Sequence, residues 1–389
     1  MAKIQNPFKA TLGATPPLLV GREEAVENFT AALEEGPGTH ERISLVVGPR
    51  GIGKTVLLNE FEKEARGRGW FVLPETATPG FVERLRTSII RELSKNKSAL
   101  AGANLTILGI GGGVNWQKEA PKENIYTLRN ALEDYLAYKS EMDRKSGQDP
   151  TGILITLDEM HYRRGNEVVE FGSTIQHLVR EGKEIAVAMA GIPSSIKPLL
   201  SATTPDEQSN QVTFLRRAER INLAAVKDED VKRALEKPLL VSGISWDNKA
   251  LSSAVEACHG YPFMIQLVGQ WAFRKREGSV ITPTASKAGI QKAQAKLGQL
   301  VHEPALEDLS DIDRTFLVYM AQDDGPSLVS DLKNRMGRSG SYVSNYRRRL
   351  IDAEMIVEAG RGRVDFALPY LRDYLREHAT ALIAEIRSN

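Results

Sequence analysis

One eight-residue motif constrains the fold of this chain more than any other feature of its sequence. Residues 48–55 read GPRGIGKT, and they lie between a β-branched run, Ile43 to Val47, and an amphipathic helical pattern. A G-x-x-x-x-G-K-[ST] loop in that setting is typical of a phosphate-binding site, because its glycines let successive backbone N–H groups turn inward. We expect Lys54 to neutralise β- and γ-phosphate oxygens and Thr55 to ligate Mg²⁺, so ATP or ADP with Mg²⁺ is the predicted ligand. The predicted nucleotide contacts in this segment are Gly48, Pro49, Arg50, Gly51, Ile52, Gly53, Lys54, Thr55 and Val56.

The region from Ile43 to about Leu223 alternates short β-branched runs with helical patterns. This alternation predicts a three-layer α/β domain with a parallel sheet covered by helices on both faces. Residues 105–116 fit either a β-hairpin or a loop, and the polar residues 143–150 indicate a surface loop. The predicted strands are Ile43 to Val47, Trp70 to Leu73, Gly152 to Leu157, Ile185 to Ala190 and Arg220 to Leu223, and two predicted helices are Phe81 to Leu93 and Val168 to Val179.

An acidic pair at the end of one predicted strand supplies the second half of the phosphate site. Asp158 and Glu159 follow the apolar run Ile153 to Leu157, about a hundred residues after the glycine-rich loop. We expect Asp158 to hold Mg²⁺ through water and Glu159 to polarise the attacking water as general base. His161, two residues further on, is interpreted as a packed or exposed side chain and not as a catalyst. The pair therefore predicts ATP hydrolysis as well as binding.

Charge and cysteine content exclude several classes of protein. Fifty-one basic side chains stand against 50 acidic ones, so a nucleic-acid partner would have to be held by a local basic patch. The single cysteine, Cys258, can form neither an intramolecular disulfide nor a cysteine-rich zinc site. The longest apolar runs are too short to span a bilayer, so no membrane partner is expected. These features predict a cytoplasmic protein.

Beyond Leu223 the strand-like pattern disappears, and two further units are predicted. Residues from Lys227 to about 302 read as three or four helices, one beginning near Asp228. From about Glu307 onward, three helical patterns precede a two-strand pattern at 356–366 and a final helix at 370–387, which is the order of a winged helix-turn-helix. We therefore expect an α/β nucleotide-binding domain at 1–223, a helical lid at 224–303 and a winged helix at 304–389.

The charge of the C-terminal unit is concentrated where such a unit would meet duplex DNA. Residues 331–350 hold six basic side chains against Asp331 alone, and the expected wing tip at 360–363 reads GRGR. Clustered cations favour binding to the phosphate backbone with modest sequence preference, whereas a solvated face or a protein-docking module is the alternative. The predicted DNA contacts are Tyr342, Ser344, Asn345, Arg347, Arg348, Arg361 and Arg363.

These elements together resemble the AAA+ ATPases. The segment Val20-Gly21-Arg22-Glu23, the phosphate loop, the strand ending in Asp158-Glu159, the helical lid and the winged-helix tail are similar to the branch of origin-recognition initiators and related bacterial ATPases. The resemblance implies that residues 19–22, including Val20, Gly21 and Arg22, lie beside the adenine, largely through backbone. The same residues also suit a helix N-terminus, with acids in its first turn.

The sequence departs from the family pattern at three points. Where AAA+ proteins commonly carry a polar sensor, Ser194 and Ser195 are weak candidates. Where the lid often supplies an arginine, the chain reads HGYPF, which resembles the glycine-x-proline element of signal-transduction (STAND) NTPases and places Pro262 near the nucleotide; Pro262 also suits a first helical turn. Arg216 and Arg217 precede the last strand, where AAA+ proteins carry an arginine finger, which implies a homo-oligomer; surface arginines are the alternative.

Two functions share this predicted nucleotide site. The first is an ATP-hydrolysing AAA+ protein whose nucleotide state controls a DNA-binding winged helix. The second is a STAND-like signalling switch whose winged helix binds an unidentified protein partner or covers the nucleotide. A metabolic kinase is disfavoured because the sequence shows no substrate-binding insertion.

Overall fold

The computed structural model describes residues 5–11, 13–95, 126–160, 166–192 and 213–378. The α/β part is built on a five-stranded parallel sheet in the order β2-β3-β4-β1-β5. Its strands are β1 (Ile43–Val47), β2 (Phe71–Thr76), β3 (Ile153–Asp158), β4 (Ile185–Gly191) and β5 (Glu219–Asn222). The predicted strands are therefore formed, each shifted by no more than a few residues, because β-branched runs between polar segments suit a sheet buried on both faces.

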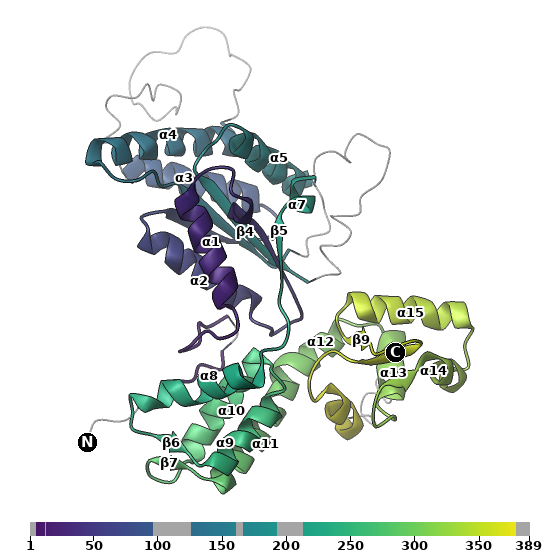
Figure 1. Ribbon diagram of the computed structural model, residues 1–389. Coiled ribbons are helices and arrows are strands. Elements are labelled where there is room, and N and C mark those ends of the chain that lie inside the picture. Colours follow the sequence, from purple (N-terminus) through teal and green to yellow (C-terminus); the bar gives the residue numbers. More distant parts are fainter. Residues whose placement is uncertain (1–4, 12, 96–125, 161–165, 193–212, 379–389) are drawn as a thin grey trace, which may run out of the picture.

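Helices cover both faces of this sheet, as Figure 1 shows. On one face, α1 (Glu23–Glu35) and α2 (Lys54–Gly67) pack against Val46 and Leu154. On the other face, α3 (Phe81–Lys95), α4 (Leu128–Ser146) and α5 (Asn166–Arg180) enclose Leu45 and Ile155. Side chains at successive strand positions therefore enter different cores, as the two-residue period of a strand requires. A short helix, α7 (Thr213–Arg216), precedes β5.

The loop expected at residues 143–150 is partly wrong. Helix α4 continues to Ser146, and Asp143 is buried, where it receives hydrogen bonds from Lys139 and from the backbone and hydroxyl of Thr151. A charged residue that reads as solvated therefore ties the helix end to the segment before β3. The segment at 105–116 lies outside the described residues.

A helical region follows β5 and packs below the sheet in the view of Figure 1. It contains α8 (Asp228–Leu240), α9 (Asn248–Cys258), α10 (Pro262–Lys275) and α11 (Pro283–Leu297). Side-chain caps at Asp247 and Thr282 and prolines at the first turns of α10 and α11 fix where three of these helices begin. The expected absence of strands is wrong, because β6 (Ser245–Trp246) and β7 (Val280–Ile281) form a short parallel pair between the helices.

The C-terminal unit combines helices with a three-stranded antiparallel sheet. A π-helical turn, Gly298–His302, and α12 (Glu303–Glu307) lead from the lid into α13 (Asp311–Met320), α14 (Val329–Met336) and α15 (Gly340–Asp352). The strands are β8 (Ser327–Leu328), β9 (Ile356–Glu358) and β10 (Arg363–Phe366), in the order β8-β10-β9. Residues 371–378 are helical, and the rest of the expected final helix lies outside the described part of the chain.

Candidate functional site

The glycine-rich loop connects β1 to α2 at the carboxyl end of the sheet. Gly51 has a φ of 73°, and a Cβ there would lie 2.0 Å from the hydroxyl oxygen of Tyr261 in the lid. That hydroxyl donates a hydrogen bond of 2.6 Å to the carbonyl of Arg50. Glycine is therefore required by the left-handed backbone and by the close approach of the lid. The loop's conformation is set jointly by the sheet and by a residue more than two hundred positions away.

The structure brings together the side chains expected to handle phosphate and metal. The Thr55 hydroxyl donates a hydrogen bond of 2.6 Å to the Asp158 carboxylate. Thr55 belongs to α2 and Asp158 to β3, and the two residues are 103 positions apart in the chain. Lys54 donates to the carbonyls of Gly48 and, at 2.9 Å, Pro49. A hydroxyl and a carboxylate side by side form the hard oxygen donor set that Mg²⁺ prefers, so the residues present fit this ion.

Glu159 adopts an unusual backbone conformation beside Asp158. Its φ is 58°, in the left-handed region that a non-glycine residue rarely enters, and its backbone N–H donates 2.8 Å to the Asp158 carboxylate. The side chain is exposed and lines the same cavity as Lys54. Strain of this kind is characteristic of functional sites, where it aims a side chain in a required direction.

Burial and charge act in opposite directions on Lys54. Desolvation lowers the pKa of the ammonium, whereas three carboxylates raise it, in the order Glu354, Glu159 and Asp158. Two of these acids belong to the predicted site, but Glu354 belongs to the C-terminal unit and was not expected there. The ammonium is thus poised among acids in a partly desolvated pocket, where its interaction with phosphate is strengthened.

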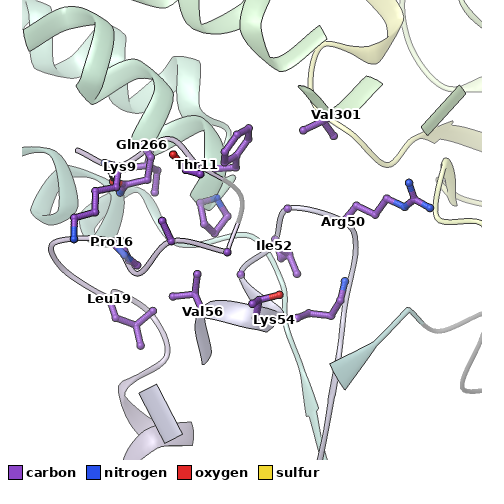
Figure 2. A pocket seen from close by; sticks show the side chains of 18 of the residues that line it. Lys9, Thr11, Pro16, Leu19, Arg50, Ile52, Lys54, Val56, Gln266 and Val301 are labelled. Atoms are coloured by element: carbon purple, nitrogen blue, oxygen red, sulfur yellow. Dashed lines mark hydrogen bonds between the residues drawn. The ribbon is translucent and has the colours of Figure 1, made fainter. Parts of the chain in front are cut away.

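A cavity of about 440 Å³ opens beside the loop, between the sheet and the lid. Figure 2 shows Lys54 and Val56 on one side and Lys9, Thr11 and Pro16 on the other. The predicted residues that line it are Leu19, Val20, Arg50, Gly51, Ile52, Gly53, Lys54, Thr55, Val56, Asp158, Glu159 and Pro262. Such a volume suits a nucleotide-sized ligand.

Four of the predicted nucleotide contacts are absent from the described residues that line the cavity: Gly21, Arg22, Gly48 and Pro49. Arg22 instead donates a 2.6 Å hydrogen bond to the carbonyl of Ala224, after β5. The acid after it, Glu23, forms a 2.6 Å ion pair with Arg233 of α8. The segment at 20–23 therefore connects the α/β part to the lid, as well as beginning α1.

Sequence reasoning missed one wall of the cavity. Residues 5–11 and 13–20, here called the N-terminal strap, contact α10 through residues 6–9, and Lys9, Thr11, Gly13, Ala14, Pro16 and Leu18 line the cavity. Phe8 is 2% exposed, and a Cβ on Gly269 of α10 would lie 2.5 Å from its ring. The Lys9 amide donates 3.1 Å to the Gln266 side chain. The strap has no helical or strand period, so the signal available in the sequence was a lone aromatic residue.

The remaining candidates lie elsewhere. Arg216 and Arg217 are exposed on and just after α7, and among the described residues neither lines the 440 Å³ cavity, so they would have to act on another copy of the chain. Arg217 instead lines a second cavity of about 200 Å³ near η1 (His40–Arg42). His161, Ser194 and Ser195 fall outside the described residues.

The predicted DNA contacts lie on α15, in the turn between β9 and β10, and at the first residue of β10. Ser344, Asn345, Arg348, Arg361 and Arg363 are exposed, and Tyr342 is half-buried under Arg338. Arg347 forms a 2.6 Å ion pair with Glu358 of β9.

A second arginine of α15, Arg349, is also paired with an acid. Arg349 forms a 2.7 Å ion pair with the buried Asp313 of α13. Part of the predicted positive charge on α15 is therefore used inside the C-terminal unit.

Comparisons with known proteins agree with this architecture. Residues 18–183 match a family described as AAA ATPase domain, and residues 299–375 match a domain of unknown function, DUF8462. A Walker-type ATPase of Pyrococcus abyssi superposes with a TM-score of 0.65 at 14% identity, covering 92% of this chain and 96% of that one. This chain therefore has the α/β P-loop fold of AAA proteins, with a helical lid region and a small C-terminal antiparallel sheet domain. No curated protein matched.

Two other solved structures are more distant. The Thermotoga maritima RuvB Holliday junction branch migration motor has a TM-score of 0.43 at 14% identity, covering 92% of this chain and 95% of that one. Domain III of the Thermotoga maritima replication initiation protein DnaA has a TM-score of 0.39 at 12% identity, with coverage of 70% and 92%. Among the described residues, each helix is too short or too polar to cross a membrane.

Proposed function

We propose that this protein binds and hydrolyses ATP at the cavity beside the glycine-rich loop. The observation that carries the proposal is the direct hydrogen bond between Thr55 and Asp158, because it joins the two halves of a phosphate and metal site from different elements. Mg²⁺ would be held by Thr55 and Asp158, and when bound it supplies positive charge to the phosphate oxygens.

The side chains of the chain itself provide the rest of the chemistry. Lys54 changes its partners from the Gly48 and Pro49 carbonyls to phosphate oxygens, where its charge stabilises the transition state. Glu159 takes a proton from the water that attacks the γ-phosphorus, and the bond to the leaving ADP oxygen breaks. The strap and the lid form walls of the cavity in which this reaction takes place.

Two substitutions test the site. Lys54→Ala should abolish nucleotide binding, and retained affinity would refute the phosphate-loop assignment. Glu159→Gln should preserve binding within a few-fold and slow single-turnover hydrolysis at least about 100-fold, the usual contribution of a general base. Unchanged turnover would remove Glu159 from the mechanism.

We further propose that the nucleotide state controls DNA binding by the C-terminal unit, which we interpret as a winged helix-turn-helix. The support is the exposure of Arg348 on α15, of Arg361 in the turn between β9 and β10, and of Arg363 at the start of β10. These cations would contact phosphates, so affinity should fall with salt and sequence preference should be modest. A specific observation favours the alternative of a protein-binding switch: Arg347 and Arg349 are held by carboxylates.

Fluorescence anisotropy on a labelled generic duplex separates these functions. Binding that weakens with salt, differs between ATP and ADP, and is lost in Arg348→Ala/Arg361→Ala supports the DNA-binding function. The matched control is Arg144→Ala/Lys145→Ala, which removes two exposed cations from α4. No binding in either nucleotide state would favour the protein-binding switch.

A further inference from the structure

The C-terminal unit approaches the glycine-rich loop beside the nucleotide cavity, through one ion pair and one buried acid. Arg50, within the loop, forms a 2.8 Å ion pair with Asp308, which follows α12 in the segment leading out of the lid. Figure 2 shows the Arg50 side chain pointing away from the strap and towards the yellow ribbon of the C-terminal unit. Val301 and Pro304, from the same connecting segment, line the cavity itself. The cavity therefore adjoins the C-terminal part of the chain as well as the lid.

The buried acid is Glu354, at the turn between α15 and β9. Glu354 is 8% exposed, and its Oε2 atom is buried with no hydrogen-bond partner among the described residues. Its backbone φ is 57°, in the left-handed region where a glycine is usual after a helix. A charged residue in this conformation, with one oxygen unsatisfied, is unfavourable for the C-terminal unit taken alone.

The charges facing Glu354 belong to the nucleotide site. The cations that act on its carboxyl are Lys54 and Arg50, and burial, only partly opposed by them, raises its pKa to about 7. Its charge also acts on Tyr261, whose hydroxyl is bonded to the loop. Of the acids acting on Lys54, Glu354 has the largest effect, ahead of Glu159 and Asp158.

A triphosphate would bring negative charge to the same two cations. In a phosphate-binding loop of this kind, the lysine contacts the β- and γ-phosphates, and Lys54 occupies that position. A γ-phosphate near a buried carboxylate places two negative charges together in a poorly solvated space. ADP lacks this group, so it brings less negative charge towards the carboxylate than ATP does. The two nucleotides thus differ in their interaction free energy with the arrangement in which Glu354 faces the loop, which is the requirement for a ligand to shift a conformational equilibrium.

We propose that Glu354 is the residue by which this protein distinguishes ATP from ADP: the C-terminal unit holds its buried carboxylate on the side of the loop where its charge acts on Lys54 and Arg50, and a γ-phosphate displaces it. This inference rests on the proposed ATP site. Glu354 acts as a specificity-determining residue contributed from outside the α/β part, and the displaced C-terminal unit carries the nucleotide signal to its partner.

The test compares the binding of ADP and of the non-hydrolysable analogue AMP-PNP to the full chain, with Mg²⁺ present. Glu354→Gln keeps the shape of the side chain and removes its charge, so the ratio of AMP-PNP to ADP affinity should rise about ten-fold, within the usual range of allosteric coupling. Glu358→Gln is the matched control, because it removes one exposed carboxylate from the neighbouring strand and should leave the ratio unchanged.

Energy transfer between dyes on Lys145→Cys and Ser341→Cys reports the position of the C-terminal unit. Both sites are exposed, and the native Cys258 is buried. AMP-PNP but not ADP should change the transfer, and Glu354→Gln should abolish this difference between nucleotides. An unchanged affinity ratio, with both nucleotides binding and Lys54→Ala removing both, would overturn this inference alone. Failure of the unsubstituted chain to bind either nucleotide would overturn the proposed function, and this inference with it.

Discussion

The N-terminal strap offers a test of how the nucleotide cavity is assembled, through the substitution Phe8→Ala. Phe8 is 2% exposed, in contact with Gly269 of α10, and anchors a segment whose following residues line the cavity. Two polar contacts fix the strap beside this anchor: Asn6 donates 3.0 Å to the Gln270 carbonyl, and the Lys9 amide donates 3.1 Å to Gln266. Such hydrogen bonds add about 1 kcal/mol each, so the aromatic ring is the main anchor.

The expected loss follows from this burial. Truncating a buried phenylalanine to alanine costs about 3–5 kcal/mol, and a loss of about 3 kcal/mol lowers a docking constant more than about 100-fold. We expect the strap to leave α10 without unfolding the rest of the chain, and the global stability loss is then capped at the docking free energy of the strap. The apparent dissociation constant of ADP rises in inverse proportion to the docked fraction, and we expect an increase of at least about ten-fold.

Two measurements check this prediction. Calorimetric titration with ADP and Mg²⁺ measures the affinity, and hydrogen exchange at the Lys9 amide measures strap docking directly. Gly269→Ala places a methyl group where the Phe8 ring lies, so it should disturb the same contact. It should therefore also weaken ADP binding and reduce the protection of the Lys9 amide. Gly67→Ala is the matched control, since the described residues around Gly67 leave open space at its Cβ position. Unchanged affinity together with unchanged Lys9 protection in Phe8→Ala would refute the role of the strap.

Two further predictions concern stability. Arg42→Met should destabilise the α/β part by about 3–5 kcal/mol in urea unfolding, because Arg42 is 2% exposed, donates to two carbonyls of α1 and forms a 2.6 Å ion pair with Glu184. A loss below about 1 kcal/mol would contradict this reasoning, and Arg144→Met is the exposed control. Burial lowers the pKa of His302 from 6.5 to about 4, so its neutral ring donates from Nε2 to a backbone carbonyl. The contribution of His302 to the free energy of unfolding is fully present above pH 6.5 and falls by up to about 3 kcal/mol as the pH falls towards 4. His302→Leu should flatten this pH dependence in thermal melts. Both chains compared carry Glu354→Gln, so that the carboxyl of Glu354, whose pKa is about 7, does not add to the dependence.

The parts of the site that the sequence predicted are those governed by local chemistry. The loop around Lys54 could be predicted because its glycine positions, a strand and a helix lie next to one another in the chain. Asp158 and Glu159 were predicted because a buried β-branched run ends in two acids. For both, the physical cause of the structure is contained within about fifteen residues.

The unpredicted parts depend on contacts between distant residues. Phe8 contributes to the cavity because Gly269 leaves room for its ring, and nothing near Phe8 in the chain indicates that partner. Glu354 reads as one more surface acid after a helix, yet tertiary packing buries it where its charge acts on Lys54. Asp143 read as solvated for the same reason, since its partner Thr151 lies beyond the end of its helix.

The packing of the lid against the C-terminal unit decides how a displaced Glu354 would transmit its motion. The Tyr370 hydroxyl donates 2.9 Å to the Ala257 carbonyl of α9, and a Cβ on Gly298 would lie 2.7 Å from the Tyr374 ring. Val301 and Leu306, on the segment that leads from the lid into the C-terminal unit, are buried in a core that also includes α/β residues such as Val46. By contrast, the Arg50 pair with Asp308 is about half exposed and contributes little, as surface pairs do.

The weak connection therefore lies between the loop and the C-terminal unit, whereas the lid and the C-terminal unit share a core. We expect the two to move as one body, hinged near residues 223–227. Energy transfer between Lys249→Cys in the lid and Ser341→Cys on α15, both exposed positions, should stay constant between ADP and AMP-PNP while the Lys145 to Ser341 pair responds. A change in the lid pair would place the flexible joint between the lid and the C-terminal unit, because packed interfaces shift between discrete arrangements and do not deform continuously.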